Sequence, residues 1–175
     1  VLKEVSDTSQ ESVLFSSGTS AAEATILALD KRCKGNSYIH PYWYYENIPT
    51  ANKSLNISNL INIDTQIALI NLEPTNFFTF DKNIEIRTPI DIIKSMAELC
   101  ILDDKSQRYI VIDVTVDPLF KISDVLEIIP KNLHVIKTLS ITKHQRGGRK
   151  YFFGAVYTNN QQIQKQILSL KPKVG

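Results

Sequence analysis

Three long apolar runs, each of strand length, are the feature that most constrains the fold of this chain. They are QIALINL at 66–72, RYIVIDVTV at 108–116 and LHVIKTLS at 133–140. The first of them is nearly continuously apolar, which is typical of a strand covered on both faces, as in a parallel sheet between layers of helices. These runs therefore indicate a sheet with helices on both sides.

Segments with helical features alternate with these strand runs. TSAAEATILALDKRC has Thr19 as its expected N-cap, and TPIDIIKSMAELCILDD has Thr88 as N-cap with Pro89 in its first turn. Further helices are expected at 122–130 and 160–170, and further strands at 13–15, 37–40 and 150–158. This alternation predicts an α/β fold of three layers, with a mostly parallel mixed sheet flanked by helices.

The composition bounds the class of protein. The 175 residues fit one ordinary domain, and no stretch has the length of a linker between two. A formal net charge of +2 gives no indication of nucleic acid or of an acidic membrane surface as a partner. No apolar run reaches the ~18 residues of a membrane span and no signal peptide opens the chain, so we expect a cytoplasmic protein. Cys33 and Cys100 lie far apart, and we expect two buried thiols rather than a disulfide.

Polar residues follow the strand runs where parallel sheets bind ligands, beyond the carboxyl ends of the strands. After the run at 13–15, Ser17, Gly18 and Thr19 lead directly into a helix. Such a turn presents backbone N–H groups and the positive end of the helix dipole to an anion. On their own, however, these residues favour a simple Ser/Thr helix cap.

Two more strand runs are followed by groups that suit a flat ring. An aromatic run at 42–45 follows the strand at 37–40, and at least one of its rings is expected to face a ligand or a partner chain. Asn76 follows the strand at 66–72, where its amide either donates to a ligand oxygen or caps a turn.

A carboxylate and a lysine complete the set. Asp113 lies at the end of a strongly apolar run, where a charge is costly without a cationic or N–H partner, so we expect a buried, paired side chain rather than a loop cap. Lys143 follows the strand at 133–140, next to Thr142 and before a basic loop that contains glycine. It is open to three interpretations: a solvated loop charge, the base of a Ser-x-x-Lys hydrolase with Ser140, or an amine that bonds an aldehyde cofactor.

Pyridoxal 5'-phosphate (PLP) requires every member of this set. Its phosphate needs N–H donors and hydroxyls, its ring an aromatic face, its phenolic oxygen a donor, its pyridine nitrogen a carboxylate and its aldehyde a lysine for a Schiff base. The chain resembles the fold-type I PLP enzymes, the aspartate aminotransferase superfamily, and most nearly their Cys/Met-metabolism branch. The motifs SSGTSA, EPTN, DVT and SITK stand here in the order of that family.

The resemblance implies a role for each matching residue around the ring. Lys143 would form the Schiff base, and Asp113 would pair with the pyridine nitrogen; these two are the implied catalytic residues. Asn76 would donate near the phenolic oxygen, and Thr115 would lie beside the ring.

The resemblance also implies a stacking residue and a phosphate site. The ring would stack on one of two aromatic side chains, Tyr42 or Trp43. The phosphate would be bound by hydroxyls and N–H groups of five residues: Ser17, Gly18, Thr19, Ser140 and Thr142.

The resemblance covers nearly the whole chain but only the large domain of the family. The family's N-terminal arm and its C-terminal domain, which supplies an Arg for the substrate carboxylate, have no counterpart in the sequence. We therefore expect residues 1–175 to be a single PLP-binding large domain and a fragment of a longer protein. The resemblance implies an amino-acid substrate, a homodimer, and either transamination or Cys/Met-type elimination or replacement.

Two other functions stay open. A non-catalytic pseudo-enzyme or assembly domain would keep the fold without the reaction, and the aromatic run motivates it. A Ser-x-x-Lys acyl-transferase would need companion Ser-Asp-Asn and Lys-Thr-Gly elements, and the nearest approach is the KTL that begins at Lys137. The ordered set of motifs favours the PLP enzyme.

Overall fold

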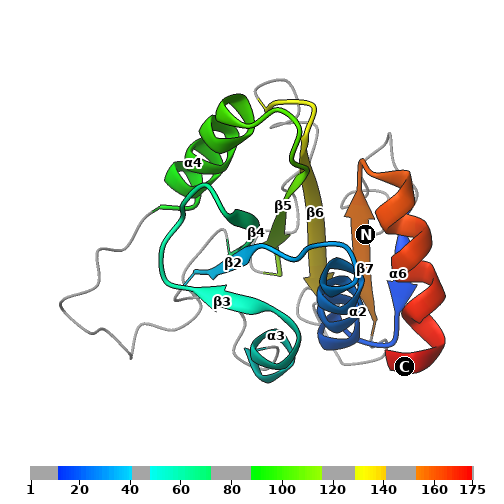
Figure 1. Ribbon diagram of the computed structural model, residues 1–175. Coiled ribbons are helices and arrows are strands. Elements are labelled where there is room, and N and C mark those ends of the chain that lie inside the picture. Colours follow the sequence, from blue (N-terminus) through cyan, green and yellow to red (C-terminus); the bar gives the residue numbers. More distant parts are fainter. Residues whose placement is uncertain (1–11, 41–47, 72–87, 116–128, 141–152, 175) are drawn as a thin grey trace.

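A seven-stranded mixed sheet forms the centre of the molecule (Figure 1). The computed structural model describes residues 12–40, 48–71, 88–115, 129–140 and 153–174. The strands lie in the order β1-β7-β6-β5-β4-β2-β3. Their bounds are Val13–Phe15 for β1, Asn36–Ile39 for β2, Asn56–Ser58 for β3, Thr65–Asn71 for β4, Arg108–Asp113 for β5, Leu133–Ser140 for β6 and Gly154–Thr158 for β7.

Most of the strand pairs are parallel. The strands from β3 through β2, β4 and β5 to β6 run in one direction, whereas β7 is antiparallel to β6 and β1 is antiparallel to β7. As a result the carboxyl ends of β1, β2, β4, β5 and β6 all point to one edge of the sheet. The mostly parallel mixed sheet expected from the apolar runs is confirmed.

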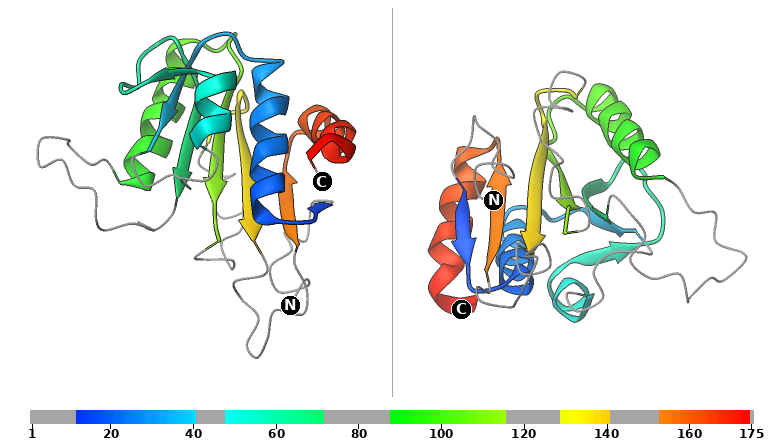
Figure 2. Two further views of the ribbon diagram at one scale, coloured as in Figure 1. Left: turned by 90° about the horizontal axis from the view of Figure 1, so that it is seen from below. Right: turned by 180° about the vertical axis from the view of Figure 1, so that it is seen from behind.

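Helices cover both faces of this sheet (Figure 2). Within the described residues the helices are α2 (Gly18–Asp30), α3 (Ile48–Ser54), α4 (Pro89–Leu102) and α6 (Gln161–Val174). The first core lies between the sheet and the helices α2, α3 and α6, and the second lies between the sheet and α4. Three of the four alanines of α2 (Ala21, Ala24 and Ala28) are fully buried in the first core, where small side chains let the helix pack closely against the strands. This arrangement confirms the three-layer α/β fold.

The N-cap of α2 differs from the sequence-based expectation. Ser17, not Thr19, is the cap: its backbone is extended (φ −153°, ψ 163°) and its Oγ accepts the N–H of Ser20 at 3.0 Å. Thr19 therefore lies inside the first turn. The expected cap of α4 is confirmed, because Thr88 and Asp91 form a reciprocal capping box and Pro89 opens the helix.

Two short elements and one strand end were not expected from the sequence. The helix α3 and the strand β3 follow the aromatic run, and neither has a strong periodic pattern in the sequence. The strand β5 ends at Asp113 rather than at residue 116. The helix expected at 122–130 lies almost entirely outside the described residues. Both cysteines are free and buried, which confirms the expectation of two thiols.

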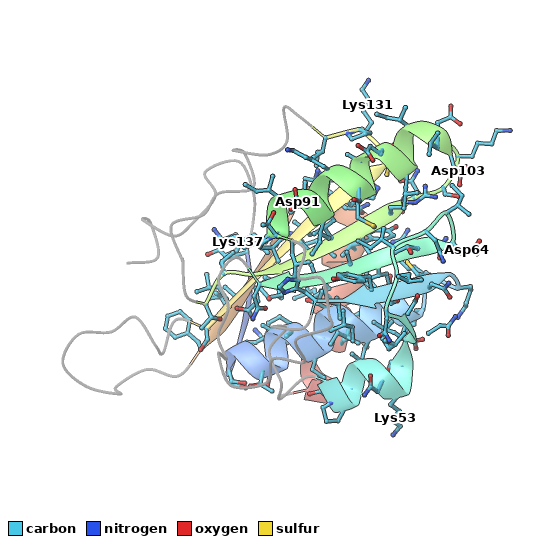
Figure 3. All side chains as sticks on the ribbon, turned by 90° about the vertical axis from the view of Figure 1, so that its left-hand side faces the viewer. Lys53, Asp64, Asp91, Asp103, Lys131 and Lys137 are labelled. Carbon is cyan, nitrogen blue, oxygen red and sulfur yellow. The ribbon has the colours of Figure 1, made fainter. Side chains whose placement is uncertain are left out.

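Arg108 holds together the amino ends of β4 and β5. Its guanidinium is buried and donates from Nε to the carbonyl oxygen of Thr65 at 3.2 Å and from Nη2 to that of Ile63 at 2.9 Å. It also donates to the Asp103 carbonyl oxygen at 3.2 Å and pairs with the Asp103 carboxylate at 3.4 Å. Figure 3 shows Asp64 and Asp103 near this end of the sheet, whereas Asp91 and Lys137 lie toward the other end.

Candidate functional site

The carboxyl edge of the sheet gathers polar residues from several strands. Asn71 at the end of β4 is in register with Asp113 at the end of β5, which is in register with Thr138 on β6. Two residues farther on, Ser140 ends β6 opposite Gly154, the first residue of β7. In an open α/β sheet this edge is where ligands bind.

Strand alternation places these polar side chains on the face that α2 covers. Residues 67 and 69 of β4, 109 and 111 of β5, and 136 of β6 all belong to the core beneath α2. Because side chains alternate along a strand, Asn71, Asp113, Thr138 and Ser140 project toward the same face. The residues that the sequence placed after separate strands therefore share one side of the sheet.

The N-terminus of α2 lies against this polar edge. The Oγ of Ser17 accepts the N–H of Ser20, and the carbonyl oxygen of Ser17 accepts the N–H of Ala21 at 3.1 Å. No acidic residue lies in the first turn of this fully described helix. The turn that begins at Gly18 thus brings backbone N–H groups and the positive end of a helix dipole to the carboxyl edge, an arrangement suited to an anion.

Two glycines let three backbone segments meet here. A Cβ on Gly18 would lie 2.5 Å from the Cβ of Ser140, and a Cβ on Gly154 would lie 2.2 Å from the carbonyl oxygen of Ser17. Neither distance is compatible with a side chain, since carbon atoms pack at about 3.5–4.0 Å. The end of β6, the start of β7 and the start of α2 therefore approach each other as closely as they do because residues 18 and 154 are glycines.

Asp113 is only partly buried, and a backbone group holds its carboxylate. Its Oδ1 accepts the N–H of Thr115 at 2.8 Å. The N–H partner agrees with the expectation, but the burial is smaller than expected because β5 ends at Asp113 and its side chain lies at the rim of the sheet. In this structure the carboxylate also caps the turn that follows β5, so the two interpretations of Asp113 are compatible.

Six of the sequence-predicted site residues lie within the described part of the chain, and the structure brings them to one edge. They are Ser17, Gly18, Thr19, Asp113, Thr115 and Ser140. The remaining five lie outside the described residues, and their roles stay predictions: Tyr42, Trp43, Asn76, Thr142 and Lys143.

Three further residues at this edge were missed by the sequence analysis. Asn71 is buried next to Asp113 in the sheet, and Thr138 is fully buried on the same face. A polar residue at the end of an apolar run was the available signal for Asn71. For Gly154 it was a glycine inside a strand-like run, which often marks a close approach of another backbone.

Lys137 occupies the opposite face of the sheet from this edge cluster. It is fully buried, and its Nζ lies 5.0 Å from the centroid of the Tyr157 ring, in the core beneath α4 (Figure 3). Ser140 is the last residue of β6, and the residues that follow it, Lys143 included, lie outside the described part of the chain. The structure therefore does not test the acyl-transferase interpretation.

Among the residues that the structure describes, no three His, Cys, Asp or Glu side chains gather as metal ligands would. None of the helices in those ranges combines the length and the hydropathy needed to cross a bilayer.

Comparisons with known proteins bear on the fold. No protein-family model matches the sequence, and no curated protein matches it. Among solved structures, a cystathionine γ-lyase from Micromonospora echinospora is similar with a TM-score of 0.62 at 16% identity, over 93% of this chain and 42% of that one. MetB from Corynebacterium glutamicum is similar with a TM-score of 0.59 at 19% identity, over 94% of this chain and 42% of that one.

An aromatic aminotransferase from Pyrococcus horikoshii is also similar, with a TM-score of 0.60 at 12% identity, over 98% of this chain and 50% of that one. The chain thus spans half or less of the length of these proteins. At such identities the likeness establishes the fold. The sheet and its helices have the α/β fold of the large domain of fold-type I PLP enzymes, as the ordered motifs led us to expect.

Proposed function

We propose that this chain is the PLP-binding large domain of an enzyme that acts on an amino acid through Lys143. The observation that carries the proposal is the convergence of Asp113, Ser140 and the N-terminus of α2 at one edge of a sheet with this fold. A carboxylate and an anion-binding helix start, on the same face and a few strand positions apart, match the two charged ends of PLP.

The start of α2 would bind the phosphate. Backbone N–H groups of Gly18 and Thr19 and the hydroxyl of Ser140 are the donors, with Thr142 as a predicted fourth. The close contact of Gly18 with Ser140 supports this assignment, because it places a hydroxyl beside the helix N-terminus: a Cβ at position 18 would lie 3.2 Å from the Oγ of Ser140. Ser17 has a different task, since its hydroxyl caps the helix.

Asp113 would hold a proton on the pyridine nitrogen. The N–H of Thr115 fixes one carboxylate oxygen, Oδ1, and so sets the direction in which the other can accept. When bound, PLP supplies an electron sink for negative charge that develops on the substrate. Lys143 would bond the aldehyde carbon in the resting enzyme and move a proton once it is freed.

The substrate class and the assembly follow from the same proposal. An amino acid would enter as the amine that displaces Lys143, and either transamination or Cys/Met-type elimination or replacement would follow. A homodimer and a cytoplasmic location stay predictions. Asn76, and Tyr42 or Trp43, are proposed to contact the phenolic oxygen and the face of the ring.

The test is cofactor uptake by the purified chain. Added PLP should give an absorption band in the ~400–430 nm range expected of a lysine-bound cofactor, and borohydride should fix it on Lys143. Lys143→Ala should lose the band, whereas Lys53→Ala, which removes an exposed lysine at the end of α3, should keep it. A protein that stays colourless with PLP, or a label on another lysine, contradicts the proposal. Uptake of PLP without turnover of any amino acid would favour the non-catalytic alternative.

A further inference from the structure

The side chain of Thr115 links the two strands that bear the proposed site. The backbone ladder between β5 and β6 reaches as far as the N–H of Val114, which donates to the carbonyl oxygen of Thr138 at 2.9 Å. At the next position the acceptor is no longer a carbonyl group. The N–H of Ser140 instead donates to the Oγ1 of Thr115 at 3.1 Å. The threonine hydroxyl therefore extends the pairing of β5 and β6 by one more hydrogen bond.

The backbone N–H of Thr115 also holds the carboxylate of Asp113. The N–H of Thr115 donates to the Oδ1 of Asp113 at 2.8 Å, so one buried residue contacts both Asp113 and Ser140. A change in the position of Thr115 would move the carboxylate and the end of β6 together. PLP has a rigid ring that carries its phosphate on a short CH2–O arm, so the distance from the phosphate to the pyridine nitrogen varies only within a narrow range, and the two groups that bind these ends need a well-defined separation as well.

We propose that Thr115 is a positioning residue that sets the distance between Asp113 and Ser140, and that its hydroxyl acts through Ser140 rather than by contact with the cofactor. The expected effect on PLP binding rests on the proposed function. The hydrogen bond from Ser140 to Thr115, in contrast, is present in the chain without cofactor. The role differs from the one that the family resemblance implies, in which the threonine lies beside the ring.

The test compares Thr115→Val with Thr115→Ser. Valine keeps the shape and the backbone N–H but removes the acceptor, whereas serine keeps both the N–H and the hydroxyl. In the PLP-free chain, amide hydrogen exchange at Ser140 should become about tenfold faster in T115V and stay within about twofold of wild type in T115S. PLP should bind about tenfold more weakly to T115V, and T115S should restore the affinity.

Thr158→Val is the matched control. The Oγ1 of Thr158 also accepts a backbone N–H, that of Asn160 at 3.2 Å, and the side chain is also buried, but it ends β7 opposite Ile136, at the end of that strand away from Ser140. T158V should speed exchange at Asn160 and leave both Ser140 and the PLP affinity unchanged. If T115V does not fold, Thr115→Ala, which removes the acceptor without adding an apolar branch, takes its place with the same expected results.

The outcomes separate this inference from the proposed function. Unchanged exchange at Ser140 in T115V overturns the inference, whatever the cofactor does. Faster exchange with unchanged PLP affinity overturns the positioning role. Weaker PLP binding without a change at Ser140 would indicate direct contact between Thr115 and the cofactor. If the wild-type chain takes up no PLP, the proposed function fails, and the positioning role, which needs a bound cofactor, fails with it.

Discussion

Replacing Gly154 with alanine should displace the start of α2 and weaken PLP binding. The new Cβ would lie 2.2 Å from the carbonyl oxygen of Ser17, 2.5 Å from its carbonyl carbon and 2.7 Å from the Cα of Gly18. All three atoms belong to the backbone, so no side chain can rotate away. Because contacts of this kind require about 3.5 Å, the first turn of α2 or the start of β7 must move by on the order of 1 Å.

The expected cost has two parts. Overpacking of this kind destabilises a fold by about 1–3 kcal/mol, which urea unfolding followed by circular dichroism would measure. A shift of this size at a helix start also moves the N–H groups of Gly18 and Thr19 away from the end of β6, and PLP should bind about tenfold more weakly. Absorbance titration with PLP gives the dissociation constant.

Gly35→Ala provides the control for stability alone. A Cβ there would lie 2.5 Å from the carbonyl oxygen of Asp64 and 2.7 Å from the Cγ of Gln66, a comparable clash before β2 at the amino end of the sheet. This variant should lose stability in the same range but bind PLP as the wild type does. If G154A binds PLP with wild-type affinity, or if G35A weakens binding equally, the proposed role of the α2 start as the phosphate site is wrong.

Three further predictions concern residues away from the site. Arg108→Met should destabilise the fold by about 2–4 kcal/mol in urea unfolding, because buried carbonyl groups lose a charged donor, while PLP affinity stays unchanged; a loss below 1 kcal/mol would contradict this. Burial, with the charge of Arg32 adding to it, lowers the pKa of His134 below its usual 6.5, so the unfolded chain takes up that proton first as pH falls. Stability should therefore decline as the pH falls below about 7, and less steeply in His134→Gln; equal slopes would refute the assignment. Burial raises the pKa of the Cys33 thiol to about 12, so the native thiol should be unreactive. A thiol-reactive disulfide reagent should therefore label Cys33 only as fast as urea unfolds the chain. Rapid labelling of the native chain would contradict this, because it would show that the thiol is accessible.

The sequence predicted those helices and strands whose local sequence signals are strong. The strand at 133–140 was predicted with its observed bounds, because its apolar residues begin directly after the polar pair Lys131 and Asn132 and give way to Ser and Thr at its end. The cap at Thr88 was predicted because a threonine directly precedes a proline at the start of a helical pattern. The same logic misplaced the cap of α2, where Ser16, Ser17 and Thr19 all suit an N-cap by residue type and the fold selects Ser17, whose backbone is extended.

The site was predicted in outline and not in its contacts. Asp113 and Ser140 could be placed at one edge for two reasons. Each lies at the end of a strand that the local sequence predicts, and the carboxyl ends of parallel strands meet at one edge of the sheet. The contact of Gly154 with Ser17 depends on how β7 turns back beside β6, and nothing local to either residue encodes it. The short elements α3 and β3 were missed because their stability comes from packing against α2 and β2 rather than from their own periodicity.

The cluster around Arg108 and the candidate site lie at opposite ends of the same parallel strands. This separation should allow the stability of the domain and the chemistry of the site to be changed independently. Since none of their hydrogen bonds described above joins the two clusters, we expect substitutions at the Arg108 end to change the melting temperature of the sheet while the Asp113 and Ser140 end keeps its geometry. A library of variants at the amino edge would therefore yield more robust versions of this domain in which the chemistry of the carboxyl edge could be altered independently.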